Sequence, residues 1–169
     1  RVAAFIKNDV ALCAYHIPLD AHEKVGNNAG LAERIGLKKV KPFGEWRNMT
    51  IGVKGVLRKP LTPDELASLV MRPEKKAAVF PFGVSDIRTV GIVSGGASED
   101  VRQAVAARLD AYITGAFEHE DYHFAKEAGI NVIAGGHYET ETVGINLVRA
   151  KLEKDLRMET AFIDIPTGL

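Results

Sequence analysis

Residues 131–141 read NVIAGGHYETE, and the other elements of the chain can be arranged around this strand, turn and helix start. The apolar run 131–134 predicts a buried strand, and the two glycines after it predict a sharp turn. With a helix beginning near Tyr138, His137 and Glu141 lie four residues apart on one face of its first turn. The stretch therefore predicts a strand–turn–helix unit that presents an imidazole and a carboxylate where the strand ends.

The composition is that of a soluble, cytoplasmic protein. Of the 169 residues, 46% are apolar, and the formal net charge is +0 with the basic residues scattered along the chain. Scattered charge argues against a nucleic-acid groove, and no apolar run approaches the roughly 18 residues that a membrane span needs. The first residues do not have the pattern of a secretory signal. We therefore expect neither a membrane nor nucleic acid as a partner.

Cys13 is the single cysteine, which excludes an intrachain disulfide and a zinc site made of four thiolates. It lies in the apolar run 10–17, which predicts a buried strand that ends at Pro18. We expect its thiol to be a small buried side chain, because nothing basic adjoins it in sequence. Any metal in this protein would have to use nitrogen and oxygen ligands.

Alternating strand and helix patterns predict an α/β fold with a mixed sheet flanked by helices. Thr62 and Glu65 form a capping box, Asn27 or Asn28 is a candidate cap for the helix that follows Gly26, and Ser98 is another candidate cap. Strands are expected at residues 10–17, as a pair within 38–60, and at 77–82, 89–93, 111–114, 131–134 and 158–165. Helices are expected at residues 1–8, 29–34, 63–71, 98–109, 120–128 and 140–156.

All five histidines lie in three polar stretches that follow predicted strands, at residues 16–22, 118–123 and 137–141. An α/β sheet brings such ends to one edge, so Asp20, His137 and Glu141 form a candidate ligand set for a divalent ion. The alternative for His137 and Glu141 is a solvated pair on a helix surface. The alternative for Asp20 is a loop or capping residue.

Two further features allow more than one interpretation. The turn at residues 94–98, SGGAS, could present backbone amides to a phosphate, but it lacks the spacing of known phosphate-binding loops and is also consistent with a plain tight turn. Trp46, which is flanked by polar residues, is a candidate for either the core or a partner surface.

Several motifs in order resemble the Nif-three-like family, whose bacterial members are commonly labelled type 2 GTP cyclohydrolase homologues. They are YHIPLDAH at 15–22, GNN at 26–28, DAYITG at 110–115, GHYETE at 136–141 and FIDIP at 162–166. The motifs extend over nearly the whole chain. The resemblance implies a Nif-three-like fold that is truncated at the N-terminus.

The resemblance also implies a site for two divalent metal ions, such as zinc, iron or manganese, in which Asp20, His137 and Glu141 match family ligands. It implies a toroidal homohexamer with these sites facing an interior cavity. The family has a His-His pair in a segment upstream of this chain, and each of these histidines would complete the shell of one metal. We therefore expect the second metal site to be incomplete within this chain.

On this basis residues 1–169 are expected to form a single domain, the C-terminal portion of a longer family fold, with residues 38–82 as a candidate inserted subregion. The expected function is that of a divalent-metal-dependent hydrolase acting on a small nucleotide-like substrate. His22, Glu118 and His119 are candidates for proton transfer. The alternative is a non-catalytic, metal-binding oligomeric scaffold or protein-interaction module.

Overall fold

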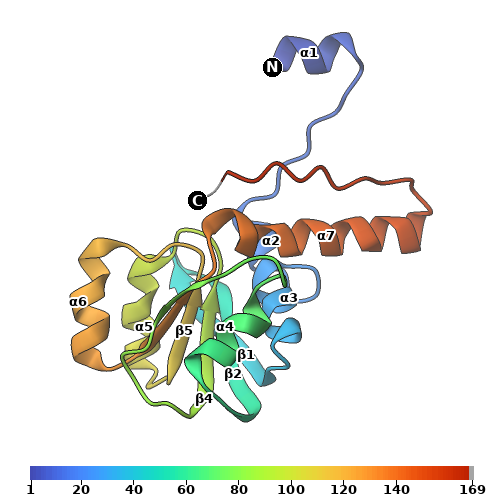
Figure 1. Ribbon diagram of the computed structural model, residues 1–169. Helices are drawn as coiled ribbons and strands as arrows, with labels where there is room; N and C mark the ends of the chain where they lie inside the picture. Colours follow the sequence, from blue (N-terminus) through green and yellow to red (C-terminus); the bar gives the residue numbers. More distant parts are fainter. Residues whose placement is uncertain (168–169) are drawn as a thin grey trace.

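The computed structural model describes residues 1–167 and contains one six-stranded sheet between two layers of helices (Figure 1). The sheet order is β1-β2-β4-β5-β6-β3. Strands β4, β5 and β6 are parallel to one another, whereas the other neighbours pair antiparallel. The strands are β1 (Lys38–Trp46), β2 (Met49–Leu61), β3 (Ala78–Phe80), β4 (Ile87–Val93), β5 (Ala111–Thr114) and β6 (Asn131–Ala134). The predicted α/β fold with a mixed sheet flanked by helices is confirmed.

Helices cover both faces of this sheet. Leu31, Leu66 and Val143, from α3, α4 and α7, belong to one hydrophobic core, while Val101 and Ala125, from α5 and α6, belong to the other. The helices are α1 (Val2–Lys7), α2 (Ile17–Asp20), α3 (Asn27–Arg34), α4 (Pro63–Val70), η1 (Ser98–Asp100, a 3₁₀ turn), α5 (Val101–Ala106), α6 (His119–Ala128) and α7 (His137–Leu156). None of the helices within residues 1–167 has the length and apolar character needed to cross a membrane.

The predicted strand pair within residues 38–60 is the hairpin of β1 and β2. Arg47 and Asn48 connect the two strands, with φ angles of 46° and 64°. Positive φ at both central residues is the conformation of a type I′ turn, whose twist matches that of the flanking strands. Trp46 pairs with Met49 directly before and after this turn. The turn therefore places the tryptophan at the tip of the hairpin.

The capping box at the start of α4 is confirmed. The Thr62 hydroxyl accepts a hydrogen bond from the Glu65 N–H at 3.2 Å, and the Glu65 carboxylate accepts one from the Thr62 N–H at 2.8 Å. The other predicted caps are wrong. Helix α3 begins at Asn27 with Gly26 as its N-cap residue, and Ala97 is the N-cap residue of η1. The asparagine and serine side chains form tertiary hydrogen bonds instead.

Two predicted strands, at residues 10–17 and 158–165, do not form. Both segments lie outside the sheet and are largely exposed, with Leu12 and Ile163 at 72% and 76% exposure. Figure 1 shows them running apart from the sheet, whose edges are β1 and β3. Apolar composition alone does not make a strand, because the backbone needs a neighbouring strand to complete its hydrogen bonds. Cys13, which was expected to be buried, is exposed.

Residues 38–82 contribute strands to both ends of the sheet. Strands β1 and β2 extend it beyond β4, and β3 adds to it beyond β6. Leu61 and Leu66 lie in the same core cluster as Ile92 of β4. The expectation that 1–169 is a single domain with this region as an insertion stays a prediction.

Helices α3 and α7 approach each other closely at two glycines. A Cβ atom at Gly30 of α3 would lie 2.5 Å from Val143 Cγ1 and 2.7 Å from Leu147 Cδ1. A Cβ atom at Gly144 of α7 would lie 2.7 Å from Asn27 Oδ1. All three distances are too short for a side chain, so the small residues fix how near α7 comes to α3.

Gly144→Val is expected to lower the free energy of unfolding by about 2–3 kcal/mol, because the new side chain would force the helices apart. Ala150→Val is the matched control, since Ala150 is exposed on the same helix and the change there costs only helix propensity, about 0.7 kcal/mol or less. Urea unfolding of both variants measures the difference. Equal losses in the two variants would contradict the close helix contact.

Candidate metal centre

The glycine turn after β4 lies directly against the side chains of His137 and Glu141. A Cβ atom at Gly95, where φ is 73°, would lie 2.4 Å from Glu141 Oε1 and 3.4 Å from His137 Nε2. A Cβ atom at Gly96 would lie 3.2 Å from His137 Cε1. Only bare backbone fits here, so the glycines leave space for the imidazole and the carboxylate.

This turn is also bonded to the start of α7 and the end of β5. The Gly95 N–H donates to the Thr140 hydroxyl at 3.1 Å, and the Gly95 carbonyl accepts from the N–H groups of Gly115 and Ala116. The Gly95 amide is therefore already used within the protein. The turn forms one wall of a site, and its interpretation as a phosphate-binding turn stays a prediction.

His137 and Glu141 lie on the first turn of α7, as the spacing predicts. Helix α7 begins at His137, earlier than the predicted start at residue 140, because Gly136 adopts a φ of 87° and turns the chain directly into the helix. His137 Nε2 lies 3.3 Å from Glu141 Oε1. The two side chains are 49% and 35% exposed, so the pair is open to a ligand.

Burial raises the pKa of the Glu141 carboxyl above its usual range, and the negative charge of Asp20 raises it further. The charges of His137 and His16 act in the opposite direction. A cation bound beside this carboxyl would lower its pKa and favour the ionised form.

Asp20 is held rigidly at the end of α2. Its Oδ1 atom accepts hydrogen bonds from Asn27 Nδ2 at 2.7 Å and from the Ser94 hydroxyl at 3.2 Å. Within residues 1–167 no hydrogen bond is formed to its Oδ2 atom, although the residue is only 8% exposed. One carboxylate oxygen is thus fixed by the protein, and the other is available to a ligand.

Asn28 ties three segments together beneath Asp20. Its side-chain amide donates to the carbonyls of Asp20 at 3.2 Å and Ile51 at 2.7 Å, and its carbonyl accepts from the Ser94 N–H at 2.8 Å. The neighbouring Asn27 accepts from the Gly144 N–H at 2.6 Å. From the sequence, Asn27 and Asn28 were candidate caps. The feature that could have indicated their buried role was two neighbouring amide side chains in a helix that must bury one face.

A cavity of about 220 Å³ opens at this place and is lined by Asp20, His137 and Glu141 together with His16. The structure therefore brings the three predicted ligands to one cavity. Among residues 1–167, no three His, Cys, Asp or Glu side chains are close enough to hold an ion as they stand. His137 and Glu141 are in direct contact, whereas Asp20 reaches the cavity from α2, and the ligand assignment stays a prediction.

The ligand types available in this cavity are suited to a divalent metal ion. One imidazole nitrogen and two carboxylates form a nitrogen and oxygen set suited to zinc, iron or manganese. The charge of Asp20 adds to the proton affinity of Glu141, and a cation between the two carboxylates would relieve this repulsion. The second ion that the family resemblance implies stays a prediction.

The three candidates for proton transfer, His22, Glu118 and His119, do not line this cavity. His22 Nδ1 accepts hydrogen bonds from the N–H groups of Lys24 and Val25 and stabilises a local turn. Glu118 and His119 are exposed at the start of α6. Within the described chain the 220 Å³ cavity is not lined by these three residues, and their catalytic role stays a prediction.

Trp46 and Asp100 are among the cavity residues that were not identified as site residues from sequence. Trp46 is half-buried against the core and also lines the cavity, so it is neither a simple core residue nor a simple surface residue. Asp100 was expected in the first turn of a helix, but it is 8% exposed and lines the same cavity. The only local feature that could have indicated a site here was the tryptophan directly before a two-residue Arg-Asn turn.

A model of the family Duf34/NIF3 (NGG1p interacting factor 3) matches residues 1–168. The chain belongs to this family. It is 41% identical to a GTP cyclohydrolase 1 type 2 homolog of Treponema pallidum and 39% identical to that of Archaeoglobus fulgidus. Both matches cover all of this chain, and they cover 71% and 67% of the length of the two relatives, respectively. This NIF3 chain thus spans about two thirds of the length of these relatives.

Solved structures of related proteins confirm the Nif-three-like fold. Protein ybgI, whose function is described as unknown, has a TM-score of 0.88 at 32% identity, with 98% of this chain and 66% of that chain covered. TTHA1606 from Thermus thermophilus has a TM-score of 0.87 at 32% identity, with 99% and 66% covered.

Asn28→Asp is expected to lower the free energy of unfolding by about 2–4 kcal/mol. The carbonyls of Asp20 and Ile51 would lose their donor and face a buried carboxylate instead. Asn8→Asp is the matched control, because Asn8 donates a single exposed hydrogen bond to the Ala4 carbonyl and should cost about 0.5 kcal/mol or less. Chemical unfolding of both variants tests this, and similar losses would contradict the role of Asn28.

The raised pKa of Glu141 predicts how stability depends on pH in metal-free protein. The folded state holds this proton more tightly than the unfolded chain, so stability falls as pH rises from the ordinary glutamate value of 4.5 through the raised pKa. Glu141→Gln should remove that loss and be more stable than the wild type at neutral pH. The advantage should vanish below about pH 4, where both forms are uncharged. Unfolding midpoints against pH, with a chelator present, would refute this if the advantage did not change.

Proposed function

We propose that this NIF3 chain binds a divalent metal ion through Asp20, His137 and Glu141 and forms part of a metal-dependent hydrolase of the GTP cyclohydrolase type 2 homolog group. The observation that carries the proposal is the meeting of one imidazole and two carboxylates at a single cavity with a glycine wall. Burial and the charge of Asp20 also raise the pKa of the Glu141 carboxyl, and a bound cation would favour its ionised form.

The protein residues have distinct roles in this proposal. When bound, the ion supplies Lewis acidity and lowers the pKa of a coordinated water. Asn27 and Ser94 orient Asp20 so that its second oxygen can act as a ligand. His16 lines the cavity and His22 does not, so His16 is better placed to accept and return a proton.

A hydrolytic ring opening is consistent with the names of the relatives. In such a step the water oxygen bonds to an electrophilic ring carbon, the C–N bond breaks with its electrons on nitrogen, and that nitrogen takes up a proton. A cavity of about 220 Å³ is smaller than the roughly 300–1,000 Å³ of pockets that enclose a whole drug-sized ligand. We therefore propose that only the reacting ring of a nucleotide-like substrate enters.

The second candidate is a metal-binding oligomeric scaffold or interaction module without turnover. The family description, which names an interacting factor, supports this alternative. The proposed homohexamer is compatible with both functions. Metal-dependent hydrolysis of any compound in a panel of purine and pyrimidine nucleotides, lost in His137→Ala, would favour the enzyme. Retained metal binding with no hydrolysis across the panel would favour the scaffold.

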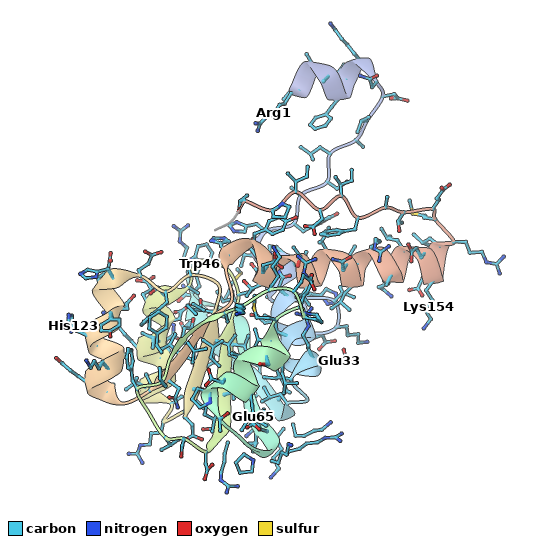
Figure 2. The ribbon with its side chains drawn as sticks, viewed as in Figure 1. Arg1, Glu33, Trp46, Glu65, His123 and Lys154 are labelled. Carbon is cyan, nitrogen blue, oxygen red and sulfur yellow. The ribbon has the colours of Figure 1, made fainter. Side chains whose placement is uncertain are left out.

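Titration of metal-free protein with Zn²⁺ in a calorimeter tests the ligand assignment. His137→Ala and Glu141→Ala should each weaken zinc binding by at least about tenfold, because each removes a direct ligand. His123→Ala is the control, since His123 is exposed on α6, away from Trp46 and the start of α7 (Figure 2). Unchanged zinc affinity in both ligand variants would overturn the assignment.

A further inference from the structure

Trp46 and Asp100 line the same cavity but take no part in the proposed metal site. Trp46 is the last residue of β1, and Figure 2 shows it near the end of α7 that begins at His137. The Arg47 guanidinium lies over the indole ring, 4.5 Å from its centroid. The indole is thus held between the Arg47 guanidinium and the core, and the remaining part of it lines the cavity.

Gln103 holds these two wall residues in a fixed relation. Its side-chain carbonyl accepts from the Glu45 N–H at 2.8 Å, and its amide donates to the Glu45 carbonyl at 3.0 Å. The same amide donates to Asp100 Oδ1. The hairpin tip that bears Trp46 is therefore connected to Asp100 through one side chain.

Asp100 is a buried carboxylate without a cation beside it. It is 8% exposed, and burial is the main reason that the pKa of its carboxyl is raised. Arg102, two residues on, pairs with Asp121 instead. Among residues 1–167 its Oδ1 atom accepts from Gln103, and no hydrogen bond is formed to Oδ2. Because Asp100 lines the cavity, a ligand that brings N–H donors can reach this oxygen.

We propose that Trp46 and Asp100 recognise a planar nitrogen heterocycle that carries a ring N–H beside an amino group. The ring would stack on the part of the indole that lines the cavity, and the Asp100 carboxylate would accept its N–H donors. A carboxylate repels ring edges that present carbonyl oxygens, so the wall selects a cyclic amidine or guanidine. The inference deepens the proposed function, on which it rests, by naming the part of the substrate that enters the cavity.

Trp46 is the only tryptophan of the chain, so its fluorescence reports directly on this wall. Isocytosine, a pyrimidine with a ring N–H beside an amino group, is the probe, and uracil, which has a carbonyl in place of the amino group, is the comparison. We expect saturable quenching by isocytosine and binding of uracil that is at least about tenfold weaker. Equal binding of the two compounds, or no saturable quenching by isocytosine, would overturn the inference.

Asp100→Asn tests the acceptor without removing volume, because the asparagine still offers an oxygen to Gln103. It should weaken isocytosine binding by about ten- to a hundredfold. Glu99→Gln is the matched control, since Glu99 also lines the cavity but is exposed, and its effect should stay within about twofold. Equal losses in the two variants, with unfolding midpoints unchanged, would overturn the role of Asp100.

Trp46→Phe and Trp46→Leu, measured by calorimetry, separate stacking from simple apolar contact. The phenylalanine variant should retain most of the affinity, and the leucine variant should lose about tenfold. Equal affinity in the two variants would overturn the stacking role.

Zinc binding measured on the same wild-type protein separates this inference from the proposed function. If the protein binds isocytosine in the presence of a chelator but binds no Zn²⁺, the result would support recognition by Trp46 and Asp100 and contradict the metal site. If the protein binds Zn²⁺ but shows no response to isocytosine, the result would overturn the recognition role of Trp46 and Asp100 and leave the metal site standing.

Discussion

The candidate site depends on the buried side chains of Asn27 and Asn28. These two amides hydrogen-bond Asp20 from α2, Ser94 from the turn after β4 and Gly144 from α7. Three segments that are distant in sequence therefore meet at the start of one short helix. Each bond satisfies a buried group that would otherwise be left without a partner, so the segments can hardly move separately. Rigid support of this kind is what a preformed ligand set requires.

The parallel part of the sheet explains why the site lies where it does. Strands β4, β5 and β6 end at the same edge, and the turns after them carry Gly95, Gly115 and Gly136. The backbone bonds between these turns bring the start of α7 over the end of β4, with no Cβ atoms in between. The imidazole and the carboxylate of α7 can therefore approach the backbone of the glycine turn. A side chain at Gly95 would occupy the position of the Glu141 oxygen.

Local chemistry made much of this arrangement predictable. The capping box of α4 and the four-residue spacing of His137 and Glu141 depend on near neighbours, and both appear in the structure. The meeting of His137 and Glu141 with the turn after β4 could also be expected, because parallel strands end at a common edge. Asp20 reaches the same cavity from α2 and not from a strand, so the strand pattern did not correctly explain its place.

Tertiary context decided the features that the sequence did not reveal. The segments 10–17 and 158–165 have apolar composition but no partner strand, so local pattern gave the wrong answer for both. Trp46 and Asp100 reach the cavity only because Gln103 joins the β1–β2 hairpin to η1, more than fifty residues away. No local pattern encodes such a contact.

The turn and 3₁₀ segment at residues 94–100 couple the two halves of the cavity. Ser94 holds Asp20, Gly95 makes room for Glu141, and Asp100, which accepts a hydrogen bond from Gln103, lines the cavity. Only a few residues separate the first of these from the last, and tertiary hydrogen bonds involving Ser94, Gly95 and Asp100 fix the segment. A ring held by Asp100 would therefore be presented to an ion held by Asp20 in an orientation set by the backbone. In hydrolytic chemistry that orientation matters more than tight binding, because the water must meet one ring carbon among several.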